Sequence, residues 1–252
     1  MQEATAEPRP DAAAMDMSLG RRILRAAGWT FIWLGALTLG FVAHQLWVTS
    51  YFAELAQTGL AEERLAYYAD VEISETEYVP LVEDDQGNLV AGVGGERPTI
   101  LVEAKPEEGA AFASIRIPRL EELQEGWTIV SGVTIPLLRS GAGHMPTTPL
   151  PGQPGNSVIS GHRTTYGAPF HNLDVLEPGD LIEVETALGV HVYEVKEPPF
   201  VVKPTELWVT EPKPGAWLTL TTCHPKFSAA ERLIVQAELV SGPNAAAILG
   251  TQ

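Results

Sequence analysis

The stretch that decides the fold covers residues 181–203 and reads LIEVETALGVHVYEVKEPPFVVK. It contains three short runs rich in β-branched and aromatic residues, at 181–186, 190–196 and 199–203. A Leu-Gly turn signal separates the first two runs. Short runs of this composition, bounded by turn residues, are typical of β-strands. The stretch therefore predicts three consecutive strands.

Similar runs continue on both sides of this stretch. Further candidate strands are 112–118, 127–130, 156–160, 217–222 and 232–239, bounded by Pro-Gly, Gly-Asn and Pro-Gly-Asp turns. About eight short strands with no long amphipathic helix between them are typical of one closed barrel or sandwich. The sequence therefore predicts an all-β domain over residues 111–241, followed by a C-terminal tail at 242–252.

An uncharged apolar run from Ala26 to Val48 precedes this domain. As a helix rising about 1.5 Å per residue it is roughly 34 Å long, enough to cross the hydrocarbon core of a bilayer. Trp29 and Trp47 lie near its ends, where amphipathic rings favour the headgroup level. A cleaved signal peptide is the alternative, but its apolar region is usually about 7–15 residues and ends at small residues. We therefore expect a retained transmembrane helix over residues 26–48.

The charges around this run predict its orientation. Arg21, Arg22 and Arg25 precede it, and no Lys or Arg follows it before Arg64. The positive-inside rule then places residues 1–25 in the cytoplasm as a tail. We expect a single-pass protein of the plasma membrane whose β-domain is extracellular.

The net charge of −16 is concentrated between the run and the β-domain. Residues 49–110 carry 14 acidic residues against three basic ones, a net charge of −11. A nucleic-acid partner is not expected, because a phosphate backbone requires a basic face. Residues 51–69 are compatible with a helix, and turn signals follow over 70–110. We interpret residues 49–110 as an acidic extracellular stalk or linker.

Cys223 is the single cysteine and lies in TLTTCHP, at the end of a candidate strand. Outside the cytoplasm a lone cysteine has no intramolecular disulfide partner. It can act simply as a small buried apolar side chain. A strand end also presents a thiol well to solvent, although the thiol needs a nearby base or cation to ionise. The choice between these two roles depends on its neighbours.

His162 has the setting that suits a partner for this thiol. It follows the candidate strand NSVIS (156–160), so it is also presented from a strand end, although a structural role stays open. His224 is adjacent to Cys223, and neighbouring strand residues point to opposite faces. The remaining histidines are assigned to the span (His44), to surface loops (His144, His171) and to a solvent-facing strand position (His191).

Arg232 opens the last candidate strand, nine positions after Cys223. A hairpin-like return would bring it beside the thiol. Its permanent charge and planar donor fork suit a developing oxyanion or a peptide carbonyl. A surface ion pair is the commoner fate of a single arginine, and this alternative stays open.

Two blocks of the sequence resemble the sortase family. They are GHMPTTPLPGQPGNSVISGHRTTYGAPFHNLDVLEPGD and LTLTTCHPKFSAAERLIV, and they most resemble the class E sortases of high-GC Gram-positive bacteria. Sortases carry the pattern Thr-Leu-x-Thr-Cys, an Arg several residues later, and a His at the end of an upstream strand. The matching positions here are Thr219, Leu220, Thr222, Cys223, Arg232 and His162.

The resemblance implies an eight-stranded closed β-barrel and a cysteine transpeptidase. Cys223 would cleave an LPxTG-like sorting signal, LAxTG by the class E resemblance, between Thr and Gly. An amine of lipid II or peptidoglycan would then resolve the thioacyl-enzyme. His162 would act as acid and then base, Arg232 would stabilise substrate and oxyanion, and Thr222 would contact substrate. We expect no cofactor and no metal.

Three alternatives use some of the same residues. A secreted thiol peptidase would form the same acyl-enzyme and only hydrolyse it. A metal site of His162, Cys223 and His224 is a second, although its spacing matches no common zinc pattern. A catalytically silent binding module on a stalk is the third, and it would not need the thiol.

Overall fold

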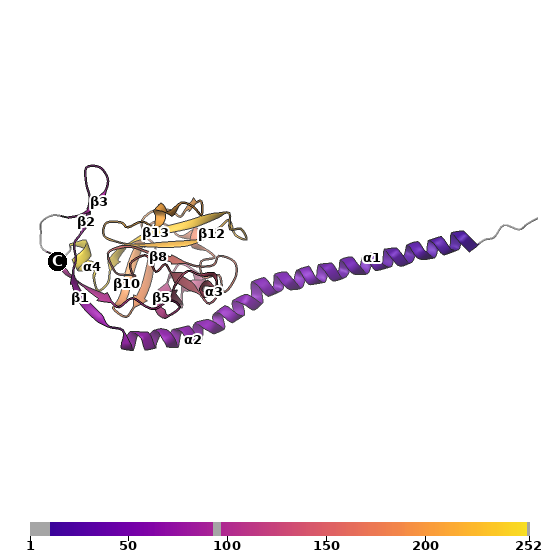
Figure 1. Ribbon diagram of the computed structural model, residues 1–252, viewed down its shortest axis with the longest axis horizontal. Coiled ribbons are helices and arrows are strands. Elements are labelled where there is room, and N and C mark those ends of the chain that lie inside the picture. Colours follow the sequence, from indigo (N-terminus) through magenta and orange to yellow (C-terminus); the bar gives the residue numbers. More distant parts are fainter. Residues whose placement is uncertain (1–10, 93–96, 251–252) are drawn as a thin grey trace, which may run out of the picture. The chain divides into compact units, whose positions relative to one another are not determined.

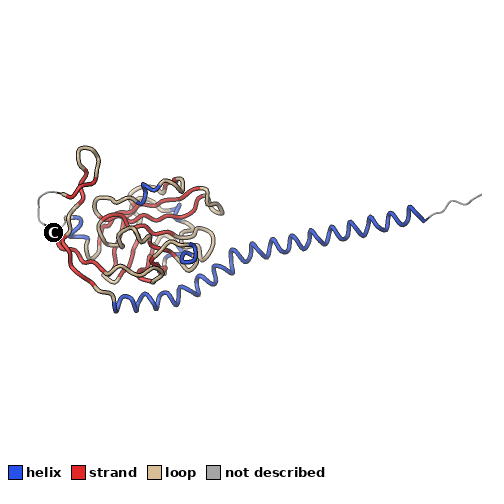
Figure 2. The backbone as a smooth tube through the Cα atoms, in the orientation of Figure 1, coloured by secondary structure: helices blue, strands red, loops and turns tan. Residues whose placement is uncertain are grey.

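The computed structural model describes residues 11–92 and 97–250 (Figure 1). The chain divides between Trp47 and Val48 into two units. The first unit is helical, and the second contains the β-structure (Figure 2).

Helix α1 (Asp11–Ala43) forms most of the first unit and leads into a π-helical turn at His44–Val48. Its large apolar side chains are exposed, with Phe31 at 74% and Leu37 at 70%. A helix with this much exposed apolar surface requires a cover of protein or lipid. By length and composition it is able to cross a membrane. Its orientation across the bilayer and the exact bounds of the span stay predictions.

The second unit is built on a closed ring of eight strands. The ring runs β10–β9–β5–β6–β7–β8–β12–β13, and β13 closes it by pairing with β10. The strands are β5 (Ala111–Arg116), β6 (Trp127–Ser131), β7 (Ala142–His144), β8 (Gly155–Ser160), β9 (Leu181–Thr186), β10 (Gly189–Val195), β12 (Ala216–His224) and β13 (Glu231–Ser241). The expected eight-stranded closed barrel is confirmed.

The membership of the ring differs from the predicted strands at two places. The run at 199–203 forms β11 (Phe200–Val202), which pairs with β13 next to the ring and is not one of its eight members. The eighth member is β7, a strand of only three residues that no candidate run covered. A segment reading Gly-Ala-Gly-His has too few β-formers to give a strand signal by itself.

The barrel interior is filled by alternating apolar side chains. Every ring strand contributes to one core, for example Phe112 from β5, Leu218 and Leu220 from β12, and Val235 and Leu239 from β13. Residues two apart on a strand share a face, so the positions between them face outward. This alternation decides which side chains reach the outer surface near the strand ends.

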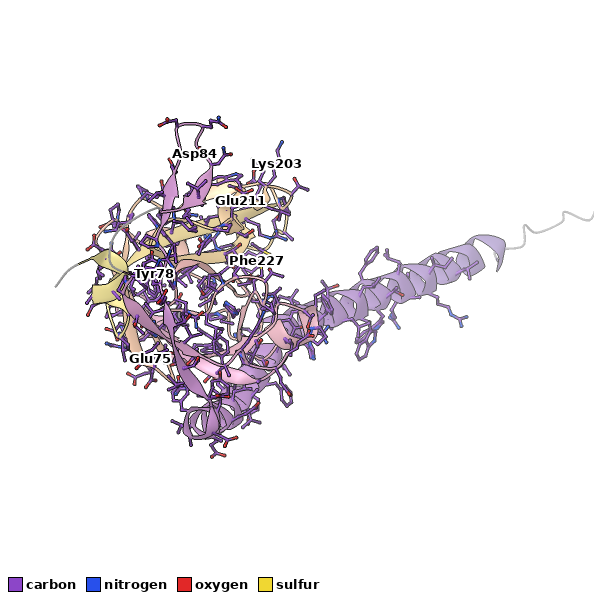
Figure 3. The ribbon with its side chains drawn as sticks, turned by 60° about the vertical axis from the view of Figure 1, so that its left-hand side comes forward. Glu75, Tyr78, Asp84, Lys203, Glu211 and Phe227 are labelled. Carbon is purple, nitrogen blue, oxygen red and sulfur yellow. The ribbon has the colours of Figure 1, made fainter. Side chains whose placement is uncertain are left out.

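Residues 49–110, the expected stalk, contain helix α2 (Thr49–Asp70), which confirms the helix expected over 51–69 and packs on β5 and β6. Strands β1 (Ile73–Glu77) and β4 (Thr99–Glu103) pair with each other. Strands β2 (Leu81–Glu83) and β3 (Leu89–Ala91) form a hairpin with Asp84 at its turn (Figure 3). The boundary between stalk and barrel at residue 111 stays a prediction.

Short helices complete the second unit. They are η2 (Glu121–Leu123), α3 (Ile135–Leu138), η3 (Leu173–Val175), η4 (Leu207–Thr210) and α4 (Ala245–Leu249). Asn244, just before α4, exchanges two hydrogen bonds of 2.9 Å with the backbone of Leu101 in β4. The C-terminal segment therefore holds part of the expected stalk against the barrel.

Candidate active site

Three neighbouring strands bring the predicted site residues together. Strands β8 and β12 are parallel, with Ser160 opposite Thr221. Parallel strands end at the same edge of a sheet, so the segment after β8 and the end of β12 meet there. Strand β13 runs antiparallel to β12 and places Arg232 directly opposite Cys223. His162, Cys223 and Arg232 consequently line one groove.

This groove lies on the outer face of the barrel and encloses about 370 Å³. Leu218 and Leu220 of β12 point into the core. The intervening positions, which include Cys223, therefore face the groove. Its lining is largely apolar and includes Ile135, Leu138, Met145, Val158, Val202, Leu207, Val209 and Ile234. The groove therefore suits an extended chain with apolar side chains next to a thiol.

Cys223 is a free, partly exposed thiol. The backbone at this residue is fixed, because its carbonyl accepts a hydrogen bond of 3.3 Å from Nη1 of Arg163. Partial exposure at a strand end, beside a histidine and an arginine, is the setting that a reactive thiol needs. The role of a buried apolar residue does not fit this exposure.

His162 is half-buried at the groove. Burial lowers the pKa of His162 below its usual range, because it disfavours the charged imidazolium, and the positive charge of Arg139 lowers this pKa further. Within the described residues, its Nε2 has no hydrogen-bond partner. This nitrogen is buried and lacks a hydrogen bond, so it is the unsatisfied polar atom of the His162 ring at the groove.

Tyr166 and Arg139 form a stack on His162. The rings of His162 and Tyr166 lie 5.0 Å apart between centres, tilted by 39°. The guanidinium of Arg139 lies 5.8 Å from the centre of the Tyr166 ring. Tyr166 has a φ of +53°, a left-handed conformation that costs a non-glycine residue about 1–3 kcal/mol. The loop thus stores strain at the point where it covers the imidazole.

Arg232 presents its guanidinium against the loop between β12 and β13. Its Nη1 donates to the carbonyls of Ala229 at 3.1 Å and Glu231 at 2.9 Å. Among the described residues, no carboxylate lies within ion-pair distance of it, so the surface ion pair considered above is not formed there. The other donors of this side chain are not engaged by a carboxylate and remain suited to a substrate carbonyl.

Thr222 is placed differently from the other predicted site residues. Its side chain is buried, with 3% exposed, and Oγ1 donates a hydrogen bond of 2.8 Å to the carbonyl of Gly161. This bond ties the end of β12 to the segment that carries His162. Contact of Thr222 with substrate stays a prediction, and its hydroxyl already has a positioning contact.

The sequence analysis missed Arg163, which connects both halves of the site. Its side chain is buried. Nη1 donates a hydrogen bond of 2.8 Å to Nδ1 of His224, in addition to the one to the Cys223 carbonyl. Its Nη2 forms an ion pair of 3.0 Å with Asp174. A buried guanidinium satisfied on three sides holds the His162 loop and the Cys223 strand end in fixed register. The one available signal was a charged residue directly after a candidate catalytic histidine.

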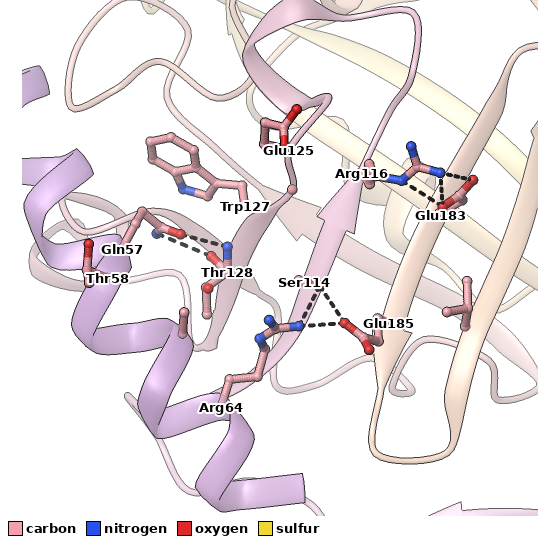
Figure 4. A pocket seen from close by; sticks show the side chains of 13 residues that line it. Gln57, Thr58, Arg64, Ser114, Arg116, Glu125, Trp127, Thr128, Glu183 and Glu185 are labelled. Atoms are coloured by element: carbon pink, nitrogen blue, oxygen red, sulfur yellow. Dashed lines mark hydrogen bonds and ion pairs between the residues drawn. The ribbon is translucent and has the colours of Figure 1, made fainter.

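A second hollow lies between α2 and strands β5, β6 and β9, and encloses about 510 Å³ (Figure 4). Its arginines already bind carboxylates. Arg64 contacts Glu185 at 2.7 Å, and Arg116 makes two bonds of 2.7 and 2.9 Å to Glu183. These paired charges stabilise the contact of α2 with the barrel, and the two arginines are already engaged by carboxylates, which makes them less suited to binding a substrate.

Metal-ligating side chains do not cluster in the part of the chain that the structure describes, where no group of three or more His, Cys, Asp or Glu could hold an ion. This includes the alternative set of His162, Cys223 and His224. The ring of His224 instead accepts a hydrogen bond from Arg163.

Comparison with known proteins identifies the family of this chain. A family model for the sortase domain matches residues 115–240. The chain is 32% identical to sortase SrtE1 of Streptomyces coelicolor over 229 residues, covering 86% of this chain and 57% of that protein. It is 29% identical to SrtE2 of the same organism over 219 residues, covering 79% and 75%.

Solved structures give the same result. Sortase E from Streptomyces avermitilis matches with 35% identity and a TM-score of 0.50, covering 56% of this chain and 95% of that one. SrtF from Corynebacterium diphtheriae matches with 33% identity and a TM-score of 0.51, covering 58% and 92%. The chain belongs to the sortase family, whose members are cysteine transpeptidases. It spans 57% of the length of SrtE1.

Proposed function

We propose that this protein is a membrane-anchored transpeptidase that cleaves an LPxTG-like sorting signal, LAxTG, between Thr and Gly. It joins the new carboxyl group to an amine of a cell-wall precursor such as lipid II or peptidoglycan. The observation that carries the proposal is the groove in which Cys223, His162 and Arg232 meet at the ends of β8, β12 and β13. The LAxTG preference rests on the resemblance to class E sortases, and the identities of 32% to SrtE1 and 29% to SrtE2 support that class.

In the first half-reaction, the Cys223 thiolate attacks the carbonyl carbon of the signal's Thr. Arg232 donates hydrogen bonds to the oxyanion that forms. The C–N bond to Gly breaks as the His162 imidazolium transfers its proton to the leaving amine. The products are a thioester on Cys223, a released peptide that begins with Gly, and a neutral imidazole.

In the second half-reaction, an acceptor amine attacks the thioester carbonyl. His162 removes the proton from this amine, and the thiolate leaves as the new amide forms. This restores the starting thiolate and imidazolium. Because water can replace the amine, hydrolysis is the competing outcome, and exclusion of water from the largely apolar groove favours transfer.

The anchoring proposal places residues 1–25 in the cytoplasm, 26–48 in the plasma membrane, and the stalk (49–110), barrel (111–241) and tail (242–252) outside. The apolar α1 and the arginines that precede the span support it. The substrates are then secreted proteins that carry a C-terminal sorting signal, and no nucleic acid is involved.

The test incubates the full chain in detergent with LAxTG and LPxTG peptides, with and without an added amine. Intact-protein mass spectrometry should show a thioester of the peptide's N-terminal fragment on Cys223, absent in Cys223→Ala. Products should carry the added amine, with LAxTG converted faster than LPxTG. A purely hydrolytic product in the presence of saturating amine would establish the thiol peptidase instead.

A further inference from the structure

The first turn of α2 contacts the loop that carries His162. The backbone N–H of Gly167 donates to Oγ of Ser50 at 3.3 Å. Ala53, one turn further, is 2% exposed. A Cβ added to Gly167, which has a φ of +76°, would lie 3.6 Å from Cβ of Ala53 and 2.5 Å from Cη2 of Trp127. Gly167, five residues after His162, therefore fits closely between α2 and the barrel.

Helix α2 is itself fixed to the barrel. Oε1 of Gln57 accepts a hydrogen bond of 2.7 Å from the backbone of Thr128, and its Nε2 donates to the carbonyl of Ser140 at 2.8 Å. Figure 4 shows the contact of Gln57 with Thr128 and, further along the helix, Arg64 reaching toward Ser114 of β5 and Glu185 of β9. A displacement of the start of α2 would thus be passed to the His162 loop by direct contacts.

The opposite face of the same two turns is apolar and exposed. Tyr51 is 63% exposed, Phe52 61% and Leu55 58%. At about 100° per residue, these side chains are centred roughly opposite Ser50, Ala53 and Gln57. At later turns Glu62 and Glu63 lie on the same side of the helix as Tyr51, Phe52 and Leu55, so this side is apolar only at the start of the helix.

The position of this face along the chain identifies its partner. The predicted span ends at Val48, so Tyr51 and Phe52 are about 5–6 Å of helix beyond it, and Leu55 about 11 Å. The headgroup layer adds about 5–8 Å to each side of the hydrocarbon core, so the two rings lie within it, where aromatic residues are favoured, and Leu55 lies at its outer edge. A lipid surface is the one partner that the chain necessarily brings to this face.

We propose that the first two turns of α2, residues 49–55, lie in the lipid headgroups with one face and hold the His162 loop with the other. This rests on the membrane anchoring in the proposed function. The bilayer then fixes the geometry of the catalytic loop. Ser50 and Ala53 are positioning residues in this arrangement and do not touch the reacting atoms.

The lipid contact is tested without any substrate, so failure of the proposed enzymatic function would not affect the result. Cys223→Ala removes the native thiol, and Leu55→Cys or Leu65→Cys introduces one bimane label in the full chain. Leu65 is 59% exposed on the same helix and is the matched control. The labelled proteins are placed in nanodiscs of phosphatidylcholine and phosphatidylglycerol, with or without brominated acyl chains.

Bromine should quench the label at position 55 at least twofold more than the label at position 65. Equal quenching at both positions, or none at position 55, would overturn the lipid contact.

The contact with the loop is tested by Ser50→Ala, with the exposed Glu54→Gln as matched control. The readout is the pH dependence of Cys223 alkylation by iodoacetamide in nanodiscs, which reports how His162 is placed beside the thiol and again requires no substrate. Ser50→Ala should shift this profile and lower peptide cleavage by about threefold or more, with an unchanged melting temperature. Superimposable profiles for wild type and Ser50→Ala would overturn the coupling.

Discussion

Two hollows on the same barrel differ in whether their arginines are paired with carboxylates. The groove at β8, β12 and β13 encloses about 370 Å³, and the hollow beside α2 encloses about 510 Å³. The larger one has more charged groups, but its arginines are bound to Glu183 and Glu185. In the smaller one, Nε2 of His162 has no partner among the described residues, and Arg232 binds only backbone carbonyls there.

The larger hollow also contains buried atoms without a hydrogen-bond partner among the described residues, Nε of Arg64 and Nε1 of Trp127. The difference therefore teaches that an arginine without a carboxylate partner, and not size or the number of charges, marks the reactive region. Arg116 and Glu183 lie opposite each other within paired strands, where cross-strand neighbours neutralise one another. His162 lies just past the end of β8, and Cys223 is the last but one residue of β12, so neither has a full set of strand neighbours. Strand ends thereby keep functional groups free for a ligand.

The largest effect expected is from Cys223→Ala. Because Cys223 is the single cysteine of the chain and the proposed nucleophile, its removal should lower turnover of a sorting-signal peptide by at least about 10⁴-fold. The measurement is peptide cleavage followed by chromatography, with near-ultraviolet circular dichroism to show that the barrel is intact. Residual turnover above about 1% would move the chemistry away from this groove and break the comparison.

Arg232→Lys should produce the next largest effect. An ammonium keeps the charge but loses the planar donor fork, and loss of one oxyanion donor costs about 10²–10³-fold in kcat. Steady-state kinetics should show the loss mainly in kcat. Lys196→Arg, on an exposed lysine that pairs with Glu194 and Glu238, is a matched exchange of the same two side-chain types. Near-normal turnover of Arg232→Lys would remove Arg232 from the site.

The pH profile tests the comparison further, because the pKa of His162 depends on the positive charge of Arg139. Among the described residues, Arg139 forms no ion pair with a carboxylate. Catalysis needs thiolate and imidazolium together, so the rate should be bell-shaped, rising through the lower pKa of the pair and falling through the higher. Since burial and Arg139 lower the pKa of His162, the rising limb should lie below pH 6.5.

Arg139→Gln removes this positive charge, which raises the pKa of His162 and moves the rising limb to higher pH. The check is kcat/KM for a peptide over a pH series. Arg119→Gln is the control, because Arg119 is paired with Glu177 and Asp180 and should leave the profile unchanged. A limb that stays in place in Arg139→Gln would show that the stacked guanidinium does not act on the imidazole.

Much of the fold was predictable because most strands carry their own signal. The three strands predicted between residues 181 and 203 have bounds within a residue or two of the observed β9, β10 and β11. Strand β7 was not predictable, since three residues including a glycine form a strand only through pairing with β6 and β8. Its pairing is imposed by tertiary structure, and local propensity contributes little.

The same division holds for the site. That Cys223, His162 and Arg232 meet was predictable from their strand-end positions together with the resemblance to sortases, since the positions alone left a structural role open for each. The surface assignments of His144 and His191 were wrong, since both are fully buried. His191 lies where a Cβ on Gly152 would be 2.0 Å from its ring, a packing contact between residues 39 apart that no local pattern contains.

The smallest effect concerns the hollow beside α2, and it tests the other half of the comparison. Arg64→Gln removes an ion pair and a bond to Ser114, both 2.7 Å, from a side chain that is 14% exposed. We expect a loss of about 1–2 kcal/mol in unfolding free energy, a fall of about 2–5 °C in Tm, and unchanged kcat/KM. Glu185 is 47% exposed, so water solvates the carboxylate that remains.

A double-mutant cycle with Glu185→Gln should then give a coupling energy below about 1 kcal/mol, as for other partly exposed pairs. The bonds of Gln57 should hold the start of α2 in place in each variant. If Arg64→Gln instead abolished turnover in a folded protein, the paired charges beside α2 would have a role in the reaction, and the pairing of arginines with carboxylates would no longer separate the two hollows.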